Sequence, residues 1–128
     1  MAYVGAVRQW ELYWADLEPT VGSEMEGERR LVMVVSNDGF NRKFPVVTVV
    51  PLTKLEGKER KPYPFEVLLP KKAAGNPLDS LVQPFQVRTI SKIRFLEPAI
   101  GILTDANIRE EIEDRLLDHF GITFDAEE

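Results

Sequence analysis

The sequence predicts a small, mostly β, barrel-like domain with one α-helix near its C-terminal end. Several short apolar segments rich in β-branched residues follow one another between loops that contain glycine and proline, a spacing typical of strands. Only residues 104–122 carry apolar residues four positions apart, which is the spacing of a helix face. A chain of 128 residues, with 44% apolar and 29% charged residues, suits a single domain spanning residues 1–128 with one core.

The N-terminal part predicts two strands separated by a long loop. Apolar and polar positions alternate in residues 8–16, which predicts a half-buried strand. The expected buried face holds Trp10, Leu12 and Trp14, and the opposite face holds Gln9, Glu11 and Tyr13. Residues 18–28, with proline, two glycines and several acids, predict a long loop. Residues 30–36 form a continuous apolar run, which predicts a short buried strand.

The middle of the chain predicts further short strands joined by exposed loops. Pro51, near the end of one of them, favours an edge position or a bulge, because proline cannot donate to a strand ladder. A bent strand or strand pair is expected to break near Pro84. The expected segments are a turn at 37–44, a strand at 45–53, a basic loop at 54–64, a strand at 65–69, a loop at 70–79, the bent strand at 80–90 and a connection with room for one more strand at 91–101.

One amphipathic helix is expected over residues 104–122. Its apolar face is formed by residues four apart along the chain: Ile108, Ile112, Leu116 and Phe120. Thr104 is the expected N-cap with Asp105 in the first turn, and Gly121 suits the position just after the helix.

Composition excludes several classes of chemistry. The chain has no cysteine, so disulfides, thiolate catalysis and cysteine metal sites are all absent. No apolar run approaches 18 residues and the N-terminus does not resemble a signal peptide, so a cytoplasmic protein is expected. The single histidine, His119, is expected near the helix end, and the helix carboxylates are expected to be solvated. No metal site and no cofactor is therefore expected.

The net charge of −5 conceals an uneven distribution along the chain. Residues 29–96 hold thirteen basic and five acidic side chains, a surplus of +8, whereas both flanking segments are acidic. One interpretation is that loop lysines only keep a small β protein soluble. The other is a basic face for a polyanion. Arginine favours the second, because its planar guanidinium matches two phosphate oxygens and remains charged at any working pH.

Six segments follow one another along nearly the whole chain: ELYWADLEPTVGSE, RLVMVVSNDGFN, VVTVVPLT, YPFEVLLP, SLVQPFQVRTI and GILTDANIREEIEDRLLDHFGI. Each segment alone is a weak signal, but the ordered set is specific. Together the segments resemble the MazF/PemK toxins of type II toxin–antitoxin modules, which are sequence-specific mRNA endoribonucleases. Three departures from the family pattern are Leu31, where proline is usual, Trp10-Glu11, where Gly-Asp is usual, and one extra residue in the loop that precedes the arginines.

The resemblance implies an SH3-like β barrel of the MazF/CcdB type with attached helices, working as a homodimer. It implies metal-independent cleavage of single-stranded RNA by attack of the ribose 2′-OH on the adjacent phosphate, leaving a 2′,3′-cyclic phosphate and a 5′-OH. It also implies a cognate antitoxin with an acidic, disordered tail as partner, with DNA contacted only through that antitoxin. The alternatives are a gyrase-poisoning toxin on the same barrel, which does not cleave RNA, and a catalytically silent binding module.

The resemblance also assigns candidate site residues. Arg30 and Thr53 are the candidate catalytic pair, at the start of one strand and the end of the next. Counting from the preceding loop instead selects Arg29, but we favour Arg30 because a strand register is firmer than a loop length. The expected RNA-binding residues are Ser23, Glu24, Arg29, Lys54 and Gln86. The general base stays open, with Glu24 as one candidate, and Arg30 and Thr53 could each be ordinary strand-end residues.

Overall fold

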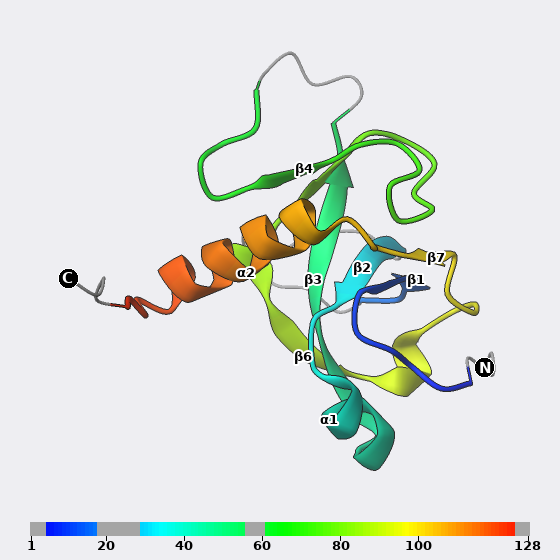
Figure 1. Cartoon of the computed structure of the whole chain (residues 1–128). Coiled ribbons are helices and arrows are strands. Elements are labelled where there is room, and N and C mark those ends of the chain that lie inside the picture. Colours follow the sequence, from blue (N-terminus) through cyan, green and yellow to red (C-terminus); the bar gives the residue numbers. More distant parts are fainter. Residues whose placement is uncertain (1–4, 18–28, 56–60, 125–128) are drawn as a thin grey trace.

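A computed structural model describes residues 5–17, 29–55 and 61–124 of the chain. Figure 1 shows a curled antiparallel sheet, a half-barrel, with one long helix crossing it. The expected mainly β fold with a C-terminal helix is therefore confirmed. In chain order the elements are β1 Glu11–Ala15, β2 Arg30–Val34, α1 Asp38–Lys43, β3 Val46–Lys54, β4 Val67–Leu69, β5 Ser80–Val82, the 3₁₀ helix η1 Pro84–Gln86, β6 Arg88–Ser91, the 3₁₀ helix η2 Lys92–Arg94, β7 Gly101–Ile102 and α2 Ala106–His119.

The sheet is organised around β3, its longest strand. The strand order is β4-β5-β3-β2-β1-β7, and β6 pairs with the first half of β3 while β5 pairs with its last three residues. On the other side of β3, β2 pairs with it so that Val32 lies opposite Pro51. All of these pairings are antiparallel.

Pro51 lies in the centre of the sheet, so the expected edge position is wrong. Its carbonyl accepts a hydrogen bond of 3.0 Å from the backbone N–H of Gln83, on the side of β3 that faces β5 and β6. The backbone nitrogen and carbonyl of one strand residue point to the same side of the strand. The N–H that proline lacks would point to the same side, at the end of the β5 pairing and next to the gap where β3 changes partner from β6 to β5.

Both faces of the central strands are buried, so the expected half-buried β1 is also wrong. Tyr13, expected on the polar face, is 1% exposed and stacks on Phe95 with ring centroids 4.1 Å apart. Trp14, expected in the core, is only partly buried. Trp10 is buried as expected, but it precedes β1 in a turn with a φ of 76° and not within the strand. The prediction for Tyr13 was wrong because this tyrosine buries its ring while its hydroxyl donates a hydrogen bond to Glu11 Oε1 at 2.8 Å.

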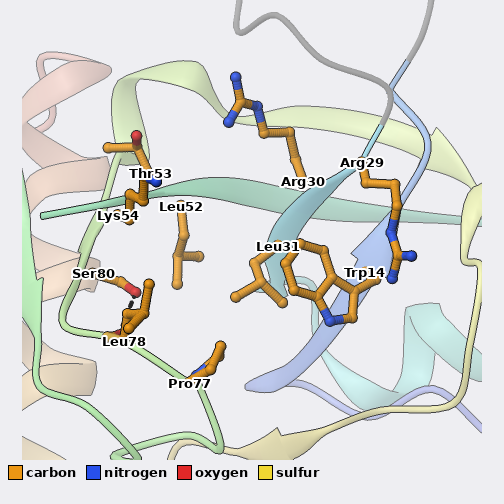
Figure 2. A pocket seen from close by; sticks show the side chains of 10 residues that line it. All are labelled: Trp14, Arg29, Arg30, Leu31, Leu52, Thr53, Lys54, Pro77, Leu78 and Ser80. Carbon is orange, nitrogen blue, oxygen red and sulfur yellow. Dashed lines mark hydrogen bonds between the residues drawn. The ribbon is translucent and has the colours of Figure 1, made fainter. Parts of the chain in front are cut away.

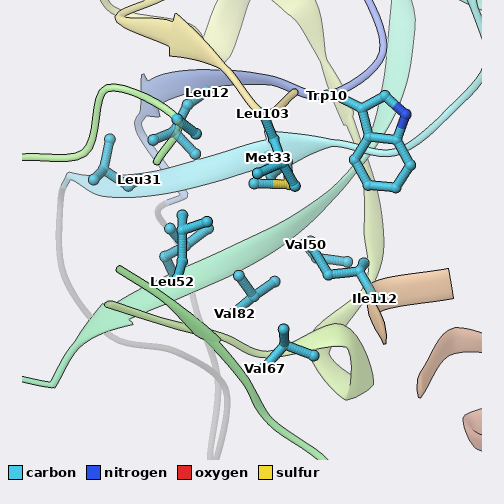
Figure 3. Packing of buried hydrophobic residues seen from close by; sticks show 12 residues of the cluster. Trp10, Leu12, Leu31, Met33, Val50, Leu52, Val67, Val82, Leu103 and Ile112 are labelled. Carbon is cyan, nitrogen blue, oxygen red and sulfur yellow. The ribbon is translucent and has the colours of Figure 1, made fainter. Parts of the chain in front are cut away.

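Two hydrophobic clusters lie on opposite sides of β1, β2 and β3. The first includes Leu12, Met33 and Val50 and is covered by Ile112 of α2 (Figure 3). The second is formed by the alternate strand residues, among them Val32, with Phe95 at its centre. Because consecutive strand residues enter different clusters, each strand is held against sliding by packing on both faces.

The segment expected as a turn at 37–44 contains the short helix α1. Asn37 caps it, and its side chain accepts from the backbone N–H of Phe40 at 2.8 Å. Asn41, fully buried within the helix, donates to the carbonyl of Ser36 at 2.8 Å and accepts from the Ser36 hydroxyl. The asparagines and the glycine of this segment predicted a turn. The Asn37 cap and the buried Asn41 amide instead stabilise about one and a half turns of helix.

The N-cap of helix α2 lies one residue later than expected. The side chain of Asp105, and not that of Thr104, accepts from the backbone N–H groups of Asn107 and Ile108. Gly121 follows the helix with a φ of 69°, as expected for a left-handed terminating residue. Ile112 is fully buried, whereas Phe120 at the end of the expected apolar face is 61% exposed. No helix in the described part of the chain is long and apolar enough to cross a membrane.

The packing of α2 gives a first prediction, on stability. Ile112→Ala removes a fully buried side chain between α2 and the sheet. We expect it to lower the free energy of unfolding by about 2–5 kcal/mol, measured by chemical denaturation. Ile93→Ala is the matched control, because Ile93 is 68% exposed and its loss should change the stability by about 0.5 kcal/mol or less. Equal losses in the two variants would contradict this packing of α2.

The second prediction concerns stability at alkaline pH. Burial, and secondly the hydrogen bond to Glu11, raises the pKa of Tyr13 well above its usual value. Since the folded state keeps the Tyr13 proton while the unfolded state loses it near pH 10, the contribution of Tyr13 to the free energy of unfolding is constant below about pH 10 and falls above it. Tyr13→Phe removes this one contribution. The free energy of unfolding of the wild type should therefore fall relative to that of Tyr13→Phe, by up to about 1.4 kcal/mol per pH unit above pH 10. A difference independent of pH would contradict it.

Candidate active site

The pairing of β2 with β3 brings Arg30 and Thr53 together. The register that sets Val32 opposite Pro51 sets Arg30 opposite Thr53 when it is extended by two residues. Residues directly opposite each other in an antiparallel pair project from the same face of the sheet. Figure 2 shows this arrangement: Arg30 and Thr53 rise on one side of the strands, while Leu31 and Leu52 project to the other. The sequence-predicted catalytic pair thus comes from two rigid strand ends.

The neighbouring Arg29 points elsewhere and is already engaged. Its Nη2 lies 2.7 Å from Oε1 of Glu97, and its guanidinium carbon lies 4.9 Å from the centroid of the Trp14 ring. In Figure 2 it extends beside Trp14, away from Thr53. Both side chains of the ion pair are about half exposed, so the pair is a surface contact that solvent and salt weaken. Arg29 and Arg30 therefore occupy different environments although they are adjacent in sequence.

One polar atom of Arg30 has no hydrogen-bond partner among the described residues. Its side chain is half-buried, and its Nε is shielded from solvent without a hydrogen-bond partner among the described residues. Leaving a buried donor unsatisfied costs about 1–3 kcal/mol. A guanidinium held in this way at the surface end of a strand is available to an anionic ligand, and Lys54 on the adjacent strand is exposed beside Thr53.

A pocket of about 340 Å³ lies at these strand ends. Its lining combines three cationic residues with two hydroxyls and an apolar wall. The lining residues are Trp14, Arg29, Arg30, Leu31, Leu52, Thr53, Lys54, Pro77, Leu78 and Ser80. The described lining contains neither a carboxylate nor an imidazole, so its fixed charge is entirely positive. Such a pocket suits a phosphate ester with an attached apolar ring.

The far wall of the pocket is a loop fixed by a buried asparagine. Asn76 is fully buried, and its side-chain amide donates to the carbonyls of Pro70 at 3.1 Å and Leu78 at 2.8 Å. Gly75 precedes it at a φ of 88°, and a Cβ there would lie 2.4 Å from the carbonyl oxygen of Ile100. The loop therefore crosses the start of β7 at a distance that only glycine allows. This fixes Pro77 and Leu78 as a preformed wall.

Part of this site could be predicted from the sequence. The structure brings together Arg29, Arg30, Thr53 and Lys54. Gln86 lies on η1, outside the residues that line the pocket, and Ser23 and Glu24 lie outside the described residues. The sequence did not indicate Trp14, which is expected in the core, or Glu97, which is 68 positions from its partner Arg29. No local signal in the sequence could have paired Arg29 with Glu97.

The histidine and the helix carboxylates of the sequence lie outside the residues that line this pocket. His119 is the last residue of α2 and is exposed, as expected. The helix carboxylates Glu110, Glu111, Glu113 and Asp114 are exposed too. Within the described ranges no three histidine, aspartate or glutamate residues lie close enough to hold a metal ion.

The fold is similar to those of solved toxin structures. A crystal structure of MazF from Deinococcus radiodurans matches with a TM-score of 0.73 and 24% identity, over 91% of this chain and 98% of that one. An endoribonuclease in complex with its cognate antitoxin, from a mycobacterial species, matches with a TM-score of 0.69 and 21% identity, over 94% of this chain and 99% of that one. These likenesses define the architecture as that of the MazF toxins.

Sequence comparison gives the family. PemK-like, MazF-like toxins of type II toxin–antitoxin systems match residues 8–120. Endoribonuclease MazF9 of Mycobacterium tuberculosis is 38% identical over 81% of this chain and 88% of its own length. Endoribonuclease EndoA of Bacillus subtilis is 33% identical over 86% of this chain and 90% of its own length. The chain belongs to the PemK-like, MazF-like toxin family, which confirms the resemblance found in the sequence.

Proposed function

We propose that this chain, an endoribonuclease toxin of its family, cleaves single-stranded mRNA at specific sequences by transesterification and without a metal ion. The observation that carries the proposal is the register that sets Arg30 opposite Thr53 at the mouth of a cationic pocket. Membership in a toxin family and two relatives named as endoribonucleases support the reaction class.

The proposed reaction forms one bond and breaks another at phosphorus. The ribose 2′-oxygen attacks the adjacent phosphate, a new O2′–P bond forms and the P–O5′ bond breaks. The 2′-OH loses its proton to water or a phosphate oxygen, and the departing 5′-oxygen gains one, leaving a 2′,3′-cyclic phosphate and a 5′-OH. The described pocket lining offers no carboxylate or imidazole to take that proton; Glu24, outside the described residues, is the protein candidate.

Arg30 and Thr53 stabilise the transition state in this scheme. The pentacoordinate phosphorane carries more negative charge than the phosphate, so a fixed guanidinium stabilises it preferentially. The Thr53 hydroxyl donates a hydrogen bond to a second phosphate oxygen. Arg29 and Lys54 bind neighbouring phosphates, and these cations supply the positive charge that a metal ion provides in other nucleases. Ser23, Glu24 and Gln86 are proposed to contact the RNA beyond this pocket.

The positive charge of the pocket also suggests the protein partner of the toxin. A cognate antitoxin with an acidic, disordered tail can fold over the cationic pocket and exclude RNA, and one solved structure of similar fold is a complex with its cognate antitoxin. We further propose that the toxin is a homodimer that acts in the cytoplasm, where its mRNA substrate is found. DNA is then contacted only through the antitoxin.

The third prediction separates the roles of the two arginines. Arg30→Ala and Thr53→Ala should each lower the cleavage rate by about 100- to 1,000-fold, because each removes one preorganised donor. Arg30→Lys should also be impaired, since lysine keeps the charge but loses the planar fork. Arg29→Ala should weaken RNA binding with a smaller effect on turnover. Single-turnover cleavage measures the rate of each variant, and thermal melting shows whether the variant is folded. The assignment is wrong if Arg29→Ala abolishes turnover while Arg30→Ala leaves it unchanged.

The fourth prediction tests the chemistry. Purified toxin should cut naked single-stranded RNA in the presence of EDTA, and the products should carry 2′,3′-cyclic phosphate and 5′-OH ends. A substrate with 2′-deoxyribose at the cut position should bind with unchanged affinity and resist cleavage, because its nucleophile is missing. Cleavage of the deoxy substrate would rule out attack by the 2′-OH. Intact RNA under all conditions would instead favour a toxin that acts by binding a protein, such as a gyrase poison.

A further inference from the structure

The carboxylate of Glu97 lies at the edge of the candidate active site. Its Oε1 accepts a hydrogen bond of 2.7 Å from Nη2 of Arg29, which lines the pocket, whereas Glu97 lies outside the lining residues. The described lining itself carries three cationic side chains and no carboxylate. Glu97 therefore places a negative charge next to a pocket whose fixed charge is positive.

The segment that carries Glu97 is fixed against β1. Phe95, which is buried, forms an isolated antiparallel bridge with the last residue of that strand. The next residue, Leu96, donates its backbone N–H to the carbonyl of Trp14 at 3.0 Å. Glu97 follows directly in the chain. Its carboxylate is therefore presented to the pocket edge by a positioned backbone.

Trp14 holds the Arg29 guanidinium from a second direction. The guanidinium carbon lies 4.9 Å from the centroid of the indole ring, within the range of about 6 Å for a cation–π contact. Figure 2 shows the Arg29 side chain beside this ring. The ring contact uses none of the five N–H donors of the guanidinium. It therefore persists when one anion bound to these donors is exchanged for another.

A carboxylate and a phosphate compete for the same donors of an arginine. Each presents two oxygens that match the planar fork of the guanidinium. Oε1 of Glu97 thus occupies a donor of Arg29 that a phosphate oxygen would use. Both side chains are about half exposed, so RNA reaches the guanidinium from solvent and the ion pair it has to break is weak.

We propose that Glu97 occupies a phosphate-binding position of this protein and thereby lowers its affinity for RNA. The inference rests on the proposed function and deepens it. In the free protein the carboxylate neutralises Arg29, and an RNA phosphate next to the scissile one replaces it on binding. Glu97 acts through Arg29 and is a positioning residue, because it does not touch the reacting atoms.

The opposite role of Glu97 gives the opposite sign. If the carboxylate held Arg29 ready for RNA, its removal would weaken RNA binding. Loss of any nearby acidic group also strengthens RNA binding through long-range charge. Competition for one guanidinium differs from that effect, because it disappears when the guanidinium is removed.

The test is a double-mutant cycle on the binding of a single-stranded RNA with 2′-deoxyribose at the cut position. Glu97→Gln should lower the dissociation constant about two- to five-fold, the effect of an exposed ion pair, and the gain should shrink at high salt. In the Arg29→Ala background the same substitution should have no effect. Glu113→Gln, which removes an exposed carboxylate of α2, is the matched control and should leave the constant unchanged. In cleavage assays the change in Glu97→Gln should appear in KM and not in kcat.

Weaker RNA binding by Glu97→Gln would overturn the proposal, and so would an equal gain in the Arg29→Ala background or in Glu113→Gln. Tighter binding of a polyglutamate peptide without tighter binding of RNA would assign the position to an acidic peptide instead. The binding readout does not depend on cleavage. A wild-type chain that binds RNA without cutting it, with the cycle as expected, would overturn the proposed reaction and leave this inference intact.

Discussion

The register between β2 and β3 is the constraint on which the candidate site depends. Side chains alternate between the two faces of a strand, so a slip of one residue would turn Arg30 to the opposite face from Thr53. Packing prevents that slip, because Val32 enters one hydrophobic cluster and Met33 enters the other. A slip would place polar side chains in these clusters, which is unfavourable. The packing of the core therefore determines the side of the sheet on which the Arg30 guanidinium lies. The packing of the core and the placement of the candidate site residues therefore both depend on the pairing of β2 with β3.

The same constraint gives two adjacent arginines different environments. Arg30, the first residue of β2, is committed by the strand to the side of Thr53, and its Nε lacks a protein partner among the described residues. Arg29 precedes the strand and turns to Glu97 and Trp14. An exposed ion pair of this kind is weak, so an arriving phosphate can replace the Glu97 carboxylate. In the proposed function Arg29 therefore holds RNA, and Arg30 acts on the scissile phosphate.

Much of this architecture could be predicted from the sequence because it follows from local pattern. The apolar runs of β2 and β3 and the four-residue spacing of α2 reflect burial directly. The choice of Arg30 and Thr53 as site residues came from the family resemblance. What could not be predicted depends on tertiary contacts. Tyr13 is buried because Phe95 and Glu11 satisfy its ring and hydroxyl. Pro51 is tolerated in the centre of the sheet because β3 changes partner there.

The most direct test of the account is a crystal structure of the toxin bound to an RNA that carries 2′-deoxyribose at the cut position, since this substrate should bind without reacting. The account predicts that the scissile phosphate lies within hydrogen-bond distance, about 3 Å, of both the Arg30 guanidinium and the Thr53 hydroxyl. Arg29 should contact a neighbouring phosphate. A scissile phosphate held by Arg29, with Arg30 turned to a protein carboxylate, would contradict it.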